Sequence, residues 1–337
     1  MQMERLIKKC CVLRFENLSN MKGGRFMNIS LVFPGVGSQY SGMGKTQYHQ
    51  YKIVRDTFDE VSEIAKTDVA SLCFDERRDA DLNILANAQI CLFTLSIAYY
   101  RLLNNYLPVS PQCCCGYSLG EYSALCSAGA FGIRNAVELI ELRSTILQKI
   151  TDSNIGRMVW VVQLDRDITA QICEDLRDAG YSIYVSAYNS PNQTAVSGDN
   201  ISMDKASGVF EEFGAIVVPL ALEGPYHCQL MQEASDYLKE INDTYIFEQV
   251  KIPVIANWNA DFYEYGNYSQ YLINQLIYPI QWIQSMHKMY ESKPDIIIEV
   301  GSKEVLTYIS KKNNKDVPII SMDHIDDLAY FFKTYFA

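Results

Sequence analysis

Positive charge is scarce in this 337-residue sequence: 29 lysines and arginines face 40 aspartates and glutamates, which gives a formal net charge of -11. Sequence-independent binding of nucleic acid requires clustered positive charge, so we expect no nucleic-acid partner. No apolar run reaches the roughly 20 residues that a membrane-spanning helix needs. We therefore expect a cytoplasmic protein with no membrane segment, although a local basic patch for an acidic partner stays open.

Metal-binding cysteine spacing is also missing, because the ten cysteines include no CxxC pair. Three cysteines are consecutive, at residues 113–115, which does not suit a disulfide framework. We expect most of them to be small buried side chains in a reducing compartment, and we predict no metal site and no bound cofactor. The loop PGVGSQ at residues 34–39 lacks both the Walker lysine spacing and GxGxxG. It is therefore interpreted as a close approach of backbone to an active site.

The first 26 residues stand apart from the rest. Their short apolar run after two lysines is too short for a signal peptide. They are interpreted either as a disordered leader or as untranslated, with Met27 as the true start, since the codons of residues 22–24 can spell a ribosome-binding sequence. The predicted domains are a large subdomain (27–152 and 221–337) and a small one (153–220).

Hydrophobic periodicity predicts an α/β fold. In the large subdomain, strands are expected at 28–33, 113–115, 253–257, 296–300 and 318–321, and helices at 51–65, 87–103, 121–128, 134–150, 268–277, 282–290 and 304–312. Residues 157–220 show a β-α-β-β-α-β pattern, with strands at 157–164, 182–188, 193–197 and 215–220 and helices at 168–179 and 202–213. This pattern is typical of a ferredoxin-like unit, inserted here into a larger α/β domain.

The pattern GYSLG at residues 116–120 follows an expected strand and precedes an expected helix. Gly-x-Ser-x-Gly in that context is a nucleophile elbow, in which a sharp turn presents the hydroxyl of Ser118. The N–H of Leu119 would then lie at a helix N-terminus, where developing negative charge is favoured. The motif alone is weak evidence and allows any esterase.

A serine nucleophile needs a base, and the chain has only four histidines: His49, His227, His287 and His324. A lone histidine is more often structural than catalytic. However, His227 follows a Gly-Pro turn where the chain leaves the inserted unit, and it comes after Ser118, as in α/β hydrolases. We therefore predict His227 as the base.

Arg143 lies among apolar residues of the expected helix at 134–150. Two interpretations are open at this point. It is either a surface arginine whose stem lies along the helix edge, or a guanidinium turned inward to hold a substrate carboxylate in a bidentate pair.

Six segments together resemble the malonyl-CoA:acyl-carrier-protein transacylases and the related polyketide-synthase acyltransferases, here of the discrete, trans-acting type. The segments are FPGVGSQ (33–39), GYSLGEYSAL (116–125), NSP with VSG (189–191 and 196–198), GPYHCQLM (224–231), QLIYPIQW (275–282) and, imperfectly, EVG with VL (299–301 and 305–306). The resemblance covers nearly the whole chain from Met27. It implies an α/β-hydrolase-like core with a parallel sheet plus an inserted ferredoxin-like subdomain.

The resemblance also implies a mechanism. Ser118, deprotonated by His227, would attack the thioester of malonyl-CoA, and the malonyl ester would pass to the phosphopantetheine thiol of an acyl carrier protein. The backbone N–H groups of Val36 and Leu119 would form the oxyanion hole. The main-chain carbonyl of Gln275 would orient His227 in place of an aspartate.

Substrate-binding positions come from the same resemblance. Arg143 matches the arginine that pairs with the malonyl carboxylate, Gln89 a substrate-lining glutamine, and Asn189 belongs to the NSP segment. Tyr226 is bulky, which goes with plain malonyl rather than methylmalonyl. Tyr117 replaces a histidine before the nucleophile and Val36 replaces a glutamine, so both departures bear on acyl selectivity.

Other functions stay open at this stage. The chain could hydrolyse acyl groups from carrier proteins, transfer an unusual extender unit, transfer between two carriers without CoA, or serve as a non-catalytic scaffold that binds carrier proteins. The departures from the fatty-acid motif favour a polyketide pathway. We expect a monomer that docks an acidic carrier protein on Lys303, Lys311, Lys312 and Lys315, or else these lysines form an ordinary solvated helix end.

Overall fold

The fold is built on a five-stranded parallel sheet in the order β7-β2-β1-β8-β9. The computed structural model describes residues 27–106, 110–220, 224–314 and 316–323. The strands are β1 (Ile29–Phe33), β2 (Cys113–Gly116), β7 (Val254–Ile255), β8 (Ile296–Glu299) and β9 (Ile319–Ser321). Their short, apolar sequences are fully buried in β1, β2, β7 and β8, as expected for a parallel sheet covered on both faces.

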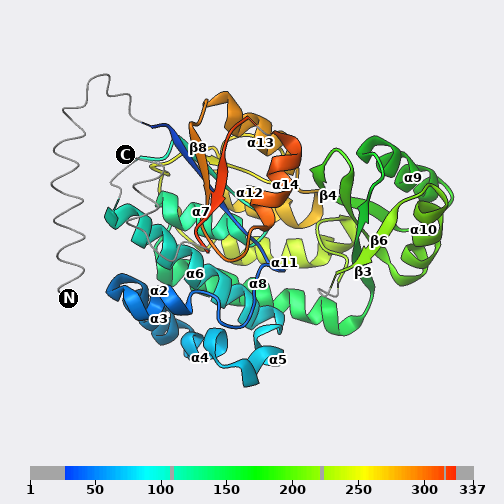
Figure 1. Ribbon diagram of the computed structural model, residues 1–337. Helices are drawn as coiled ribbons and strands as arrows, with labels where there is room; N and C mark the ends of the chain where they lie inside the picture. The colour runs from blue at the N-terminus through cyan, green and yellow to red at the C-terminus, as the bar shows by residue number, and fades with distance from the viewer. Residues whose placement is uncertain (1–26, 107–109, 221–223, 315, 324–337) are drawn as a thin grey trace.

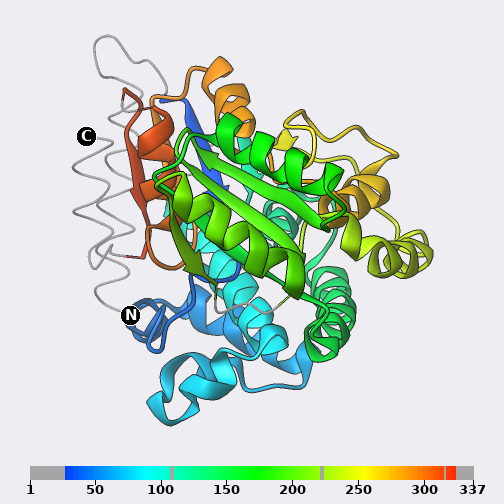
Figure 2. The ribbon, with the colours of Figure 1, turned by 90° about the vertical axis from the view of Figure 1, so that its right-hand side faces the viewer.

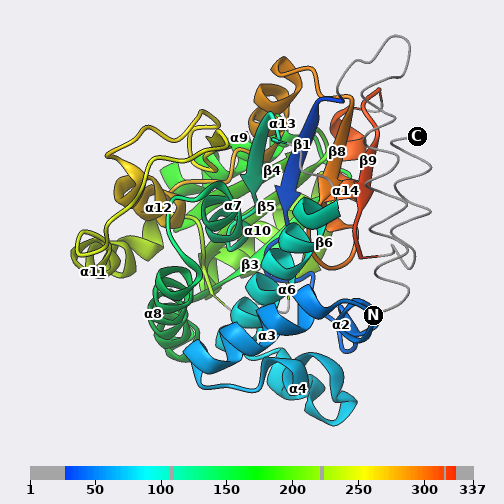
Figure 3. The same ribbon diagram turned by 90° about the vertical axis from the view of Figure 1, so that its left-hand side faces the viewer.

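Helices cover both faces of this sheet. They are α2 (Lys45–Gln50), α3 (Lys52–Ala65), α4 (Val69–Phe74), α5 (Asp79–Leu82), α6 (Leu85–Tyr106), α7 (Gly120–Ala128), α8 (Ile133–Ser153), α11 (Gln232–Asn242), α12 (Tyr268–Ile277), α13 (Trp282–Glu291) and α14 (Val305–Asn313), with 3-10 turns η1 (Glu76–Arg78) and η2 (Gln229–Met231). Figure 3 shows α6 and α7 in front of the sheet. Alternate strand residues enter two different cores, so Leu31 packs with α3 and α6 whereas Val32 packs with α13.

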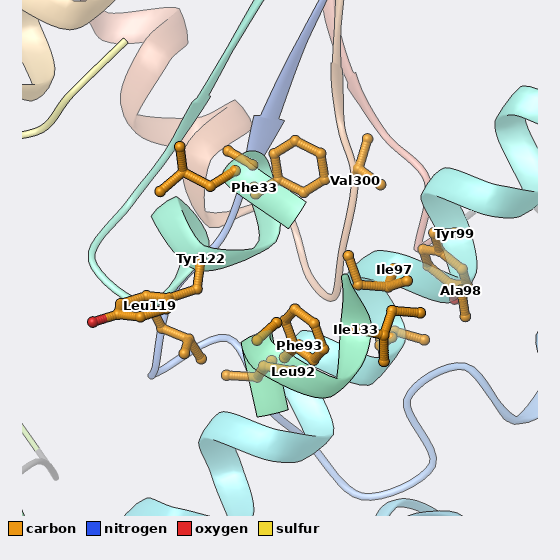
Figure 4. Packing of buried hydrophobic residues seen from close by; sticks show 14 of the residues in the cluster. Phe33, Leu92, Phe93, Ile97, Ala98, Tyr99, Leu119, Tyr122, Ile133 and Val300 are labelled. Atoms are coloured by element: carbon orange, nitrogen blue, oxygen red, sulfur yellow. The ribbon is translucent and has the colours of Figure 1, made fainter. Parts of the chain in front are cut away.

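The core that contains Leu31 also packs against the turn between β2 and α7. Phe33 at the end of β1 and Leu119 at the start of α7 belong to it, together with apolar residues of α6 (Figure 4). Because both residues are fully buried, the ends of β1 and β2 and the start of α7 are fixed by packing against α6. This packing positions the turn that carries Ser118.

A second, antiparallel sheet has the order β4-β5-β3-β6. Its elements are β3 (Gly156–Val162), α9 (Arg166–Asp178), β4 (Ile183–Ser190), β5 (Gln193–Asp199), α10 (Asn200–Glu212) and β6 (Ile216–Pro219). Both helices pack on one face around a separate core (Figures 1 and 2). The predicted β-α-β-β-α-β order is confirmed, and the strand order is that of a ferredoxin-like unit.

Sequence periodicity located every strand and the helices of nine or more residues except α11, and it misplaced or omitted the short elements. The strand expected at 253–257 has only two residues in β7, and α2, α4, α5 and both 3-10 turns were not predicted. Helices of four to six residues complete too few turns to show a 3.6-residue period. The boundaries predicted for the domains, at residues 153 and 220, stay a prediction.

Two predictions about composition can be compared with the described residues. Eight cysteines lie in this part of the chain; all are free and seven are buried, as expected for small apolar side chains. Cys10 and Cys11, like the whole leader at 1–26 and His324, lie outside it. Among the described residues no single helix has the length and hydropathy to cross a membrane, and only the bent pair Glu76–Leu82 and Leu85–Asn105 meets that criterion jointly.

Candidate active site

The turn between β2 and α7 has the geometry of a nucleophile elbow. Ser118 adopts a left-handed backbone conformation with φ 51°, which is strained for a residue with a Cβ atom. The flanking glycines permit the tight turn: a Cβ atom on Gly116 would lie 1.9 Å from the carbonyl carbon of Gly120, and one on Gly120 would lie 2.0 Å from the oxygen of Phe33. No side chain fits at either position. The strand-to-helix context that the motif requires is thus present.

Ser118 faces His227 across 109 residues of chain. The Ser118 Oγ lies 2.9 Å from His227 Nε2, and His227 Nδ1 lies 2.7 Å from the backbone oxygen of Gln275. A carbonyl oxygen only accepts, so Nδ1 carries the hydrogen and Nε2 is left to accept the serine proton. Burial lowers the pKa of His227 to about 4; the Gln275 carbonyl opposes this shift and the positive charge of Arg143 contributes to it. The imidazole is therefore neutral at pH 7, as a general base must be.

Arg143 points inward from α8, so its interpretation as a surface arginine is wrong. Its side chain is 3% exposed; one terminal nitrogen donates to Gln89 Oε1 and the other donates to Ser118 Oγ at 3.3 Å. The guanidinium carbon lies 5.7 Å from the centre of the Tyr122 ring. Burial lowers the pKa of Arg143, but a guanidinium stays protonated in proteins.

This buried cation has unfilled hydrogen-bonding capacity. The Nε of Arg143 and the Nε2 of Gln89 are both buried and have no hydrogen-bond partner among the described residues. No carboxylate pairs with Arg143 in that part of the chain either. Buried donors of this kind are costly unless a ligand satisfies them. The arrangement suits an anionic ligand group placed beside Ser118.

Tyr117 and Asn189 form a direct link between the elbow and the antiparallel sheet. The Tyr117 hydroxyl donates to Asn189 Oδ1 at 2.8 Å, and its ring meets Trp282 edge-on with centroids 5.5 Å apart. Asn313 Nδ2 donates to the backbone oxygen of Asn189 at 3.0 Å. Tyr117 therefore forms a wall next to the nucleophile, and the Asn189 side-chain oxygen already has a donor.

Tyr226 precedes His227 and is buried. Its hydroxyl lies 2.6 Å from Thr151 Oγ1 near the end of α8, and its backbone oxygen accepts from Ser197 Oγ at 2.9 Å. The ring is thus held between α8 and the antiparallel sheet. Since α8 also carries Arg143, Tyr226 and Arg143 are anchored to the same helix.

The loop after β1 packs tightly on the elbow. A Cβ atom on Gly35 would lie 2.4 Å from the backbone oxygen of Tyr117, so only glycine allows this approach. The next residue, Val36, and Leu119 at the start of α7 donate no backbone hydrogen bond to another group among the described residues. Both N–H groups are available to an oxyanion, and their roles stay predictions.

Sequence reasoning missed two buried residues that hold the elbow in place. Asn257 Oδ1 accepts from the N–H of Ser118 at 2.7 Å, and Asn257 Nδ2 donates to the oxygen of Gly116. Glu121 is fully buried and accepts from the N–H of Asn257 at 2.8 Å. One signal was available: Glu121 is the only charged residue between Arg101 and Arg134. Asn257 carried no comparable signal.

Other candidates lie away from this site or outside the described chain. His49 and His287 are exposed. Among the described residues no group of three or more histidines, cysteines, aspartates or glutamates could hold a metal ion. The Nζ of Lys303 lies 3.3 Å from the oxygen of Gly37, and that of Lys312 lies 3.3 Å from Gln193 Oε1, whereas Lys315 lies outside the described residues.

Comparison with known proteins defines the class of this site. Residues 30–325 match the family model described as acyl transferase domain. The chain therefore belongs to the acyl transferase family, which accounts for an elbow serine paired with histidine in an α/β fold.

Individual relatives narrow the family further. A malonyl CoA-acyl carrier protein transacylase of Bacillus subtilis (strain 168) is 32% identical over 308 residues, covering 91% of this chain and 96% of the relative. A solved acyl carrier protein S-malonyltransferase from Vibrio cholerae is 31% identical with TM-score 0.85, covering 91% and 99%. A malonyl-transacylase solved with its holo type II polyketide-synthase acyl-carrier protein has TM-score 0.86 and 27% identity, covering 90% and 98%. The chain is an enzyme of the malonyl CoA-acyl carrier protein transacylase family, as its sequence resemblance predicted.

Proposed function

We propose that this enzyme moves a malonyl group from malonyl-CoA to the phosphopantetheine thiol of an acyl carrier protein through an ester on Ser118. The observation that carries the proposal is the buried Arg143, which contacts Ser118 Oγ and has an unpartnered Nε. A malonyl thioester ends in a free carboxylate, which a guanidinium binds in a bidentate manner. An acyl group without that carboxylate would leave the buried donors unsatisfied.

The first half-reaction loads the enzyme. His227 Nε2 takes the proton of Ser118 as Oγ attacks the thioester carbonyl, and the N–H groups of Val36 and Leu119 stabilise the resulting oxyanion. The carbon–sulfur bond then breaks, and CoA leaves as a thiol after receiving the proton from His227. The malonyl group remains as an ester on Ser118.

The second half-reaction reverses these steps with a different thiol. His227 takes the proton of the carrier's phosphopantetheine thiol, the thiolate attacks the ester, and Ser118 leaves and regains its proton. The carboxylate held by Arg143 and Gln89 fixes the acyl group against this attack. CoA is a substrate, and the proposed chemistry needs no resident metal or cofactor.

Intact-protein mass spectrometry tests this function directly. The wild-type protein should gain the mass of one malonyl group on mixing with malonyl-CoA, and Ser118→Ala should not. Adding a holo carrier protein should move the malonyl group to the carrier. Release of free malonate without a carrier product would favour an acyl hydrolase instead, and failure to load any acyl group would leave the scaffold interpretation.

We further propose that the enzyme serves polyketide rather than fatty-acid synthesis. Support comes from Tyr117 and Val36, which differ from the fatty-acid motif beside the acyl pocket, and from the likeness to a transacylase of a type II polyketide synthase. Transfer rates to the organism's fatty-acid and polyketide carriers, measured at equal concentrations, test this. A faster rate with the fatty-acid carrier would contradict it.

A further inference from the structure

Glu121 is a buried carboxylate, and two of its hydrogen-bond partners, Asn257 and Gln275, also contact the catalytic pair. It occupies the first turn of α7, three residues after Ser118, and is 0% exposed. Three donors converge on it: the N–H of Asn257 at 2.8 Å and the Tyr263 hydroxyl at 2.9 Å on Oε1, and Gln275 Nε2 on Oε2. A buried carboxylate with three donors is fixed in orientation. It cannot reach a substrate directly.

One set of hydrogen bonds connects Glu121 to the nucleophile. Glu121 anchors the backbone of Asn257, whose side-chain amide bridges both sides of the elbow. Its oxygen accepts from the N–H of Ser118 at 2.7 Å and its nitrogen donates to the oxygen of Gly116. The strained φ of 51° at Ser118 requires such support from the surroundings. Asn257 lies 136 residues from Glu121 in sequence, so local propensity does not supply it.

A second set of hydrogen bonds connects Glu121 to His227, the base. Gln275 Nε2 donates to Glu121 Oε2 and to the backbone oxygen of Ser118, the latter at 2.9 Å. The backbone oxygen of the same residue accepts from His227 Nδ1 at 2.7 Å. The side chain of Gln275 therefore fixes the position from which its carbonyl orients the imidazole.

We propose that Glu121 is a positioning residue that holds Ser118 and His227 at reacting distance through Asn257 and Gln275. A hydrolase triad places an aspartate directly on the histidine. Here the carboxylate of Glu121 contacts the side chain of Gln275, and the backbone carbonyl of Gln275 contacts the histidine. The inference rests on the proposed acyl transfer and adds the residue that keeps its two catalytic groups aligned.

Glu121→Gln removes the carboxylate with almost no change in shape. A glutamine amide has one acceptor and one donor end, so it must turn a donor toward either Gln275 Nε2 or the N–H of Asn257. One buried donor then loses its partner, and we expect the rate of malonyl loading to fall by about tenfold to hundredfold. The affinity for malonyl-CoA, measured in a Ser118→Ala background, should change by less than about twofold because Arg143 is untouched.

Tyr263→Phe is the matched comparison. Its hydroxyl contacts the same carboxylate oxygen but leads to neither Ser118 nor His227. Loss of that bond should lower the loading rate by at most about threefold while reducing thermal stability as much as Glu121→Gln does. Equal rate losses in the two variants would mean that Glu121 acts only by stabilising the fold, and would overturn the inference.

The pH profile gives a readout that a purely structural role would not move. Burial raises the pKa of Glu121 to about 7, against its hydrogen bonds and the charge of Arg143. Arg143 stays protonated at that pH, whereas Cys115, Tyr122 and Tyr263 are neutral because burial raises their pKa values. Only the ionised carboxylate accepts all three donors. Positioning is therefore complete above about pH 7 and weakens as the pH falls through that value.

The expected pH dependence of malonyl loading follows from the ionisation of Glu121. The wild-type loading rate should drop in a step near pH 7 toward the Glu121→Gln rate, and the Glu121→Gln profile should lack this step. Matching profiles would overturn the inference. The wild type tests the proposed function itself. If it loads no malonyl at any pH, the proposed acyl transfer is wrong. If the wild type loads normally and Glu121→Gln is unimpaired, only the role of Glu121 is rejected.

Discussion

A buried guanidinium is the residue that separates this site from that of a general esterase. Ser118 and His227 would suffice to attack any activated acyl group, but Arg143 places a positive charge against the nucleophile with donors left over. In the proposed function, selectivity for the malonyl carboxylate therefore depends on this side chain and on the glutamine that it contacts. The nucleophile and base alone carry none of it.

Replacement of Arg143 should change selectivity more than reactivity. Arg143→Ala should lower kcat/KM for malonyl-CoA by about tenfold to hundredfold, because a charge-assisted pair with the carboxylate is lost. Loading of acetyl-CoA, which has no carboxylate, should fall less or rise. Arg143→Lys keeps the charge but not the planar guanidinium. Its kcat/KM for malonyl-CoA should lie between those of the wild type and Arg143→Ala. Unchanged selectivity in competition assays read by protein mass would show that the carboxylate binds elsewhere.

In the proposed mechanism, the protonation of His227 sets the lower pH limit of the reaction. Its ordinary pKa of 6.5 is lowered to about 4, chiefly by burial. Protonated His227 cannot accept the serine proton, so activity is present above that value and is lost as the pH falls through it. We expect kcat/KM for malonyl-CoA to vanish around pH 4, below the partial step attributed to Glu121. A single complete loss near pH 6.5, in protein shown to be folded by circular dichroism, would contradict the burial argument.

At the scale of elements, the site depends on how closely the loop after β1 approaches the elbow. Gly35→Ala would bring a methyl group within 2.4 Å of the Tyr117 backbone oxygen, so the loop that presents the Val36 N–H must move. We expect a loss of stability of about 1–3 kcal/mol and a lower loading rate. Gly208→Ala is the control: nothing lies within 4 Å of its added methyl, and in the interior of α10 it should stabilise by about 0.5–1 kcal/mol. Urea unfolding and loading assays distinguish the pair, and a fully active Gly35→Ala would mean that this approach is not needed.

Sequence patterns predicted the elements that are long enough to repeat and the motifs that are local. The helix α8 and the strands β1 and β2 follow from periodicity, and Ser118, His227, Arg143 and Gln275 follow from motif order. Asn257 and Glu121 were not predicted because their role depends on contacts across more than 130 residues. A sequence shows which residues are polar, but only the packed fold shows which polar groups meet. The inward direction of Arg143 was undecided for the same reason.

At the scale of the whole molecule, backbone hydrogen bonds join the antiparallel sheet to the segment between α12 and α13 beside the site. The N–H of Ile280 donates to Ser186 and its oxygen accepts from Tyr188, both at 2.9 Å. Ile280 follows α12, which carries Gln275, and the two partner residues belong to β4. The wall formed by Tyr117 and Asn189 is therefore tied to the element that orients His227. The residues beside Ser118 and the segment that orients the base are therefore held together by β4.

Charge at the surface should govern the second substrate rather than the first. The enzyme carries a net charge of -11, and the proposed carrier partner belongs to a class that is usually acidic, so docking requires a local positive region. The end of α14 lies close to the site, since Asn313 donates to Asn189, and it carries Lys311 and Lys312. Lys312 also contacts Gln193 and lies over the Tyr308 ring, whereas Lys311 is exposed.

Lys311→Glu should therefore raise KM for the carrier protein by about threefold to tenfold at low salt, with the difference shrinking as salt screens the charges. Malonyl loading from CoA should not change, because Lys311 is exposed and takes no part in the hydrogen bonds described around Ser118. Lys205→Glu is the control, because it makes the same charge change at an exposed residue of α10. This helix packs on the antiparallel sheet. If both variants weaken transfer equally, the carrier responds to net charge alone; if neither does, α14 is an ordinary solvated helix end and the carrier approaches the serine over another surface.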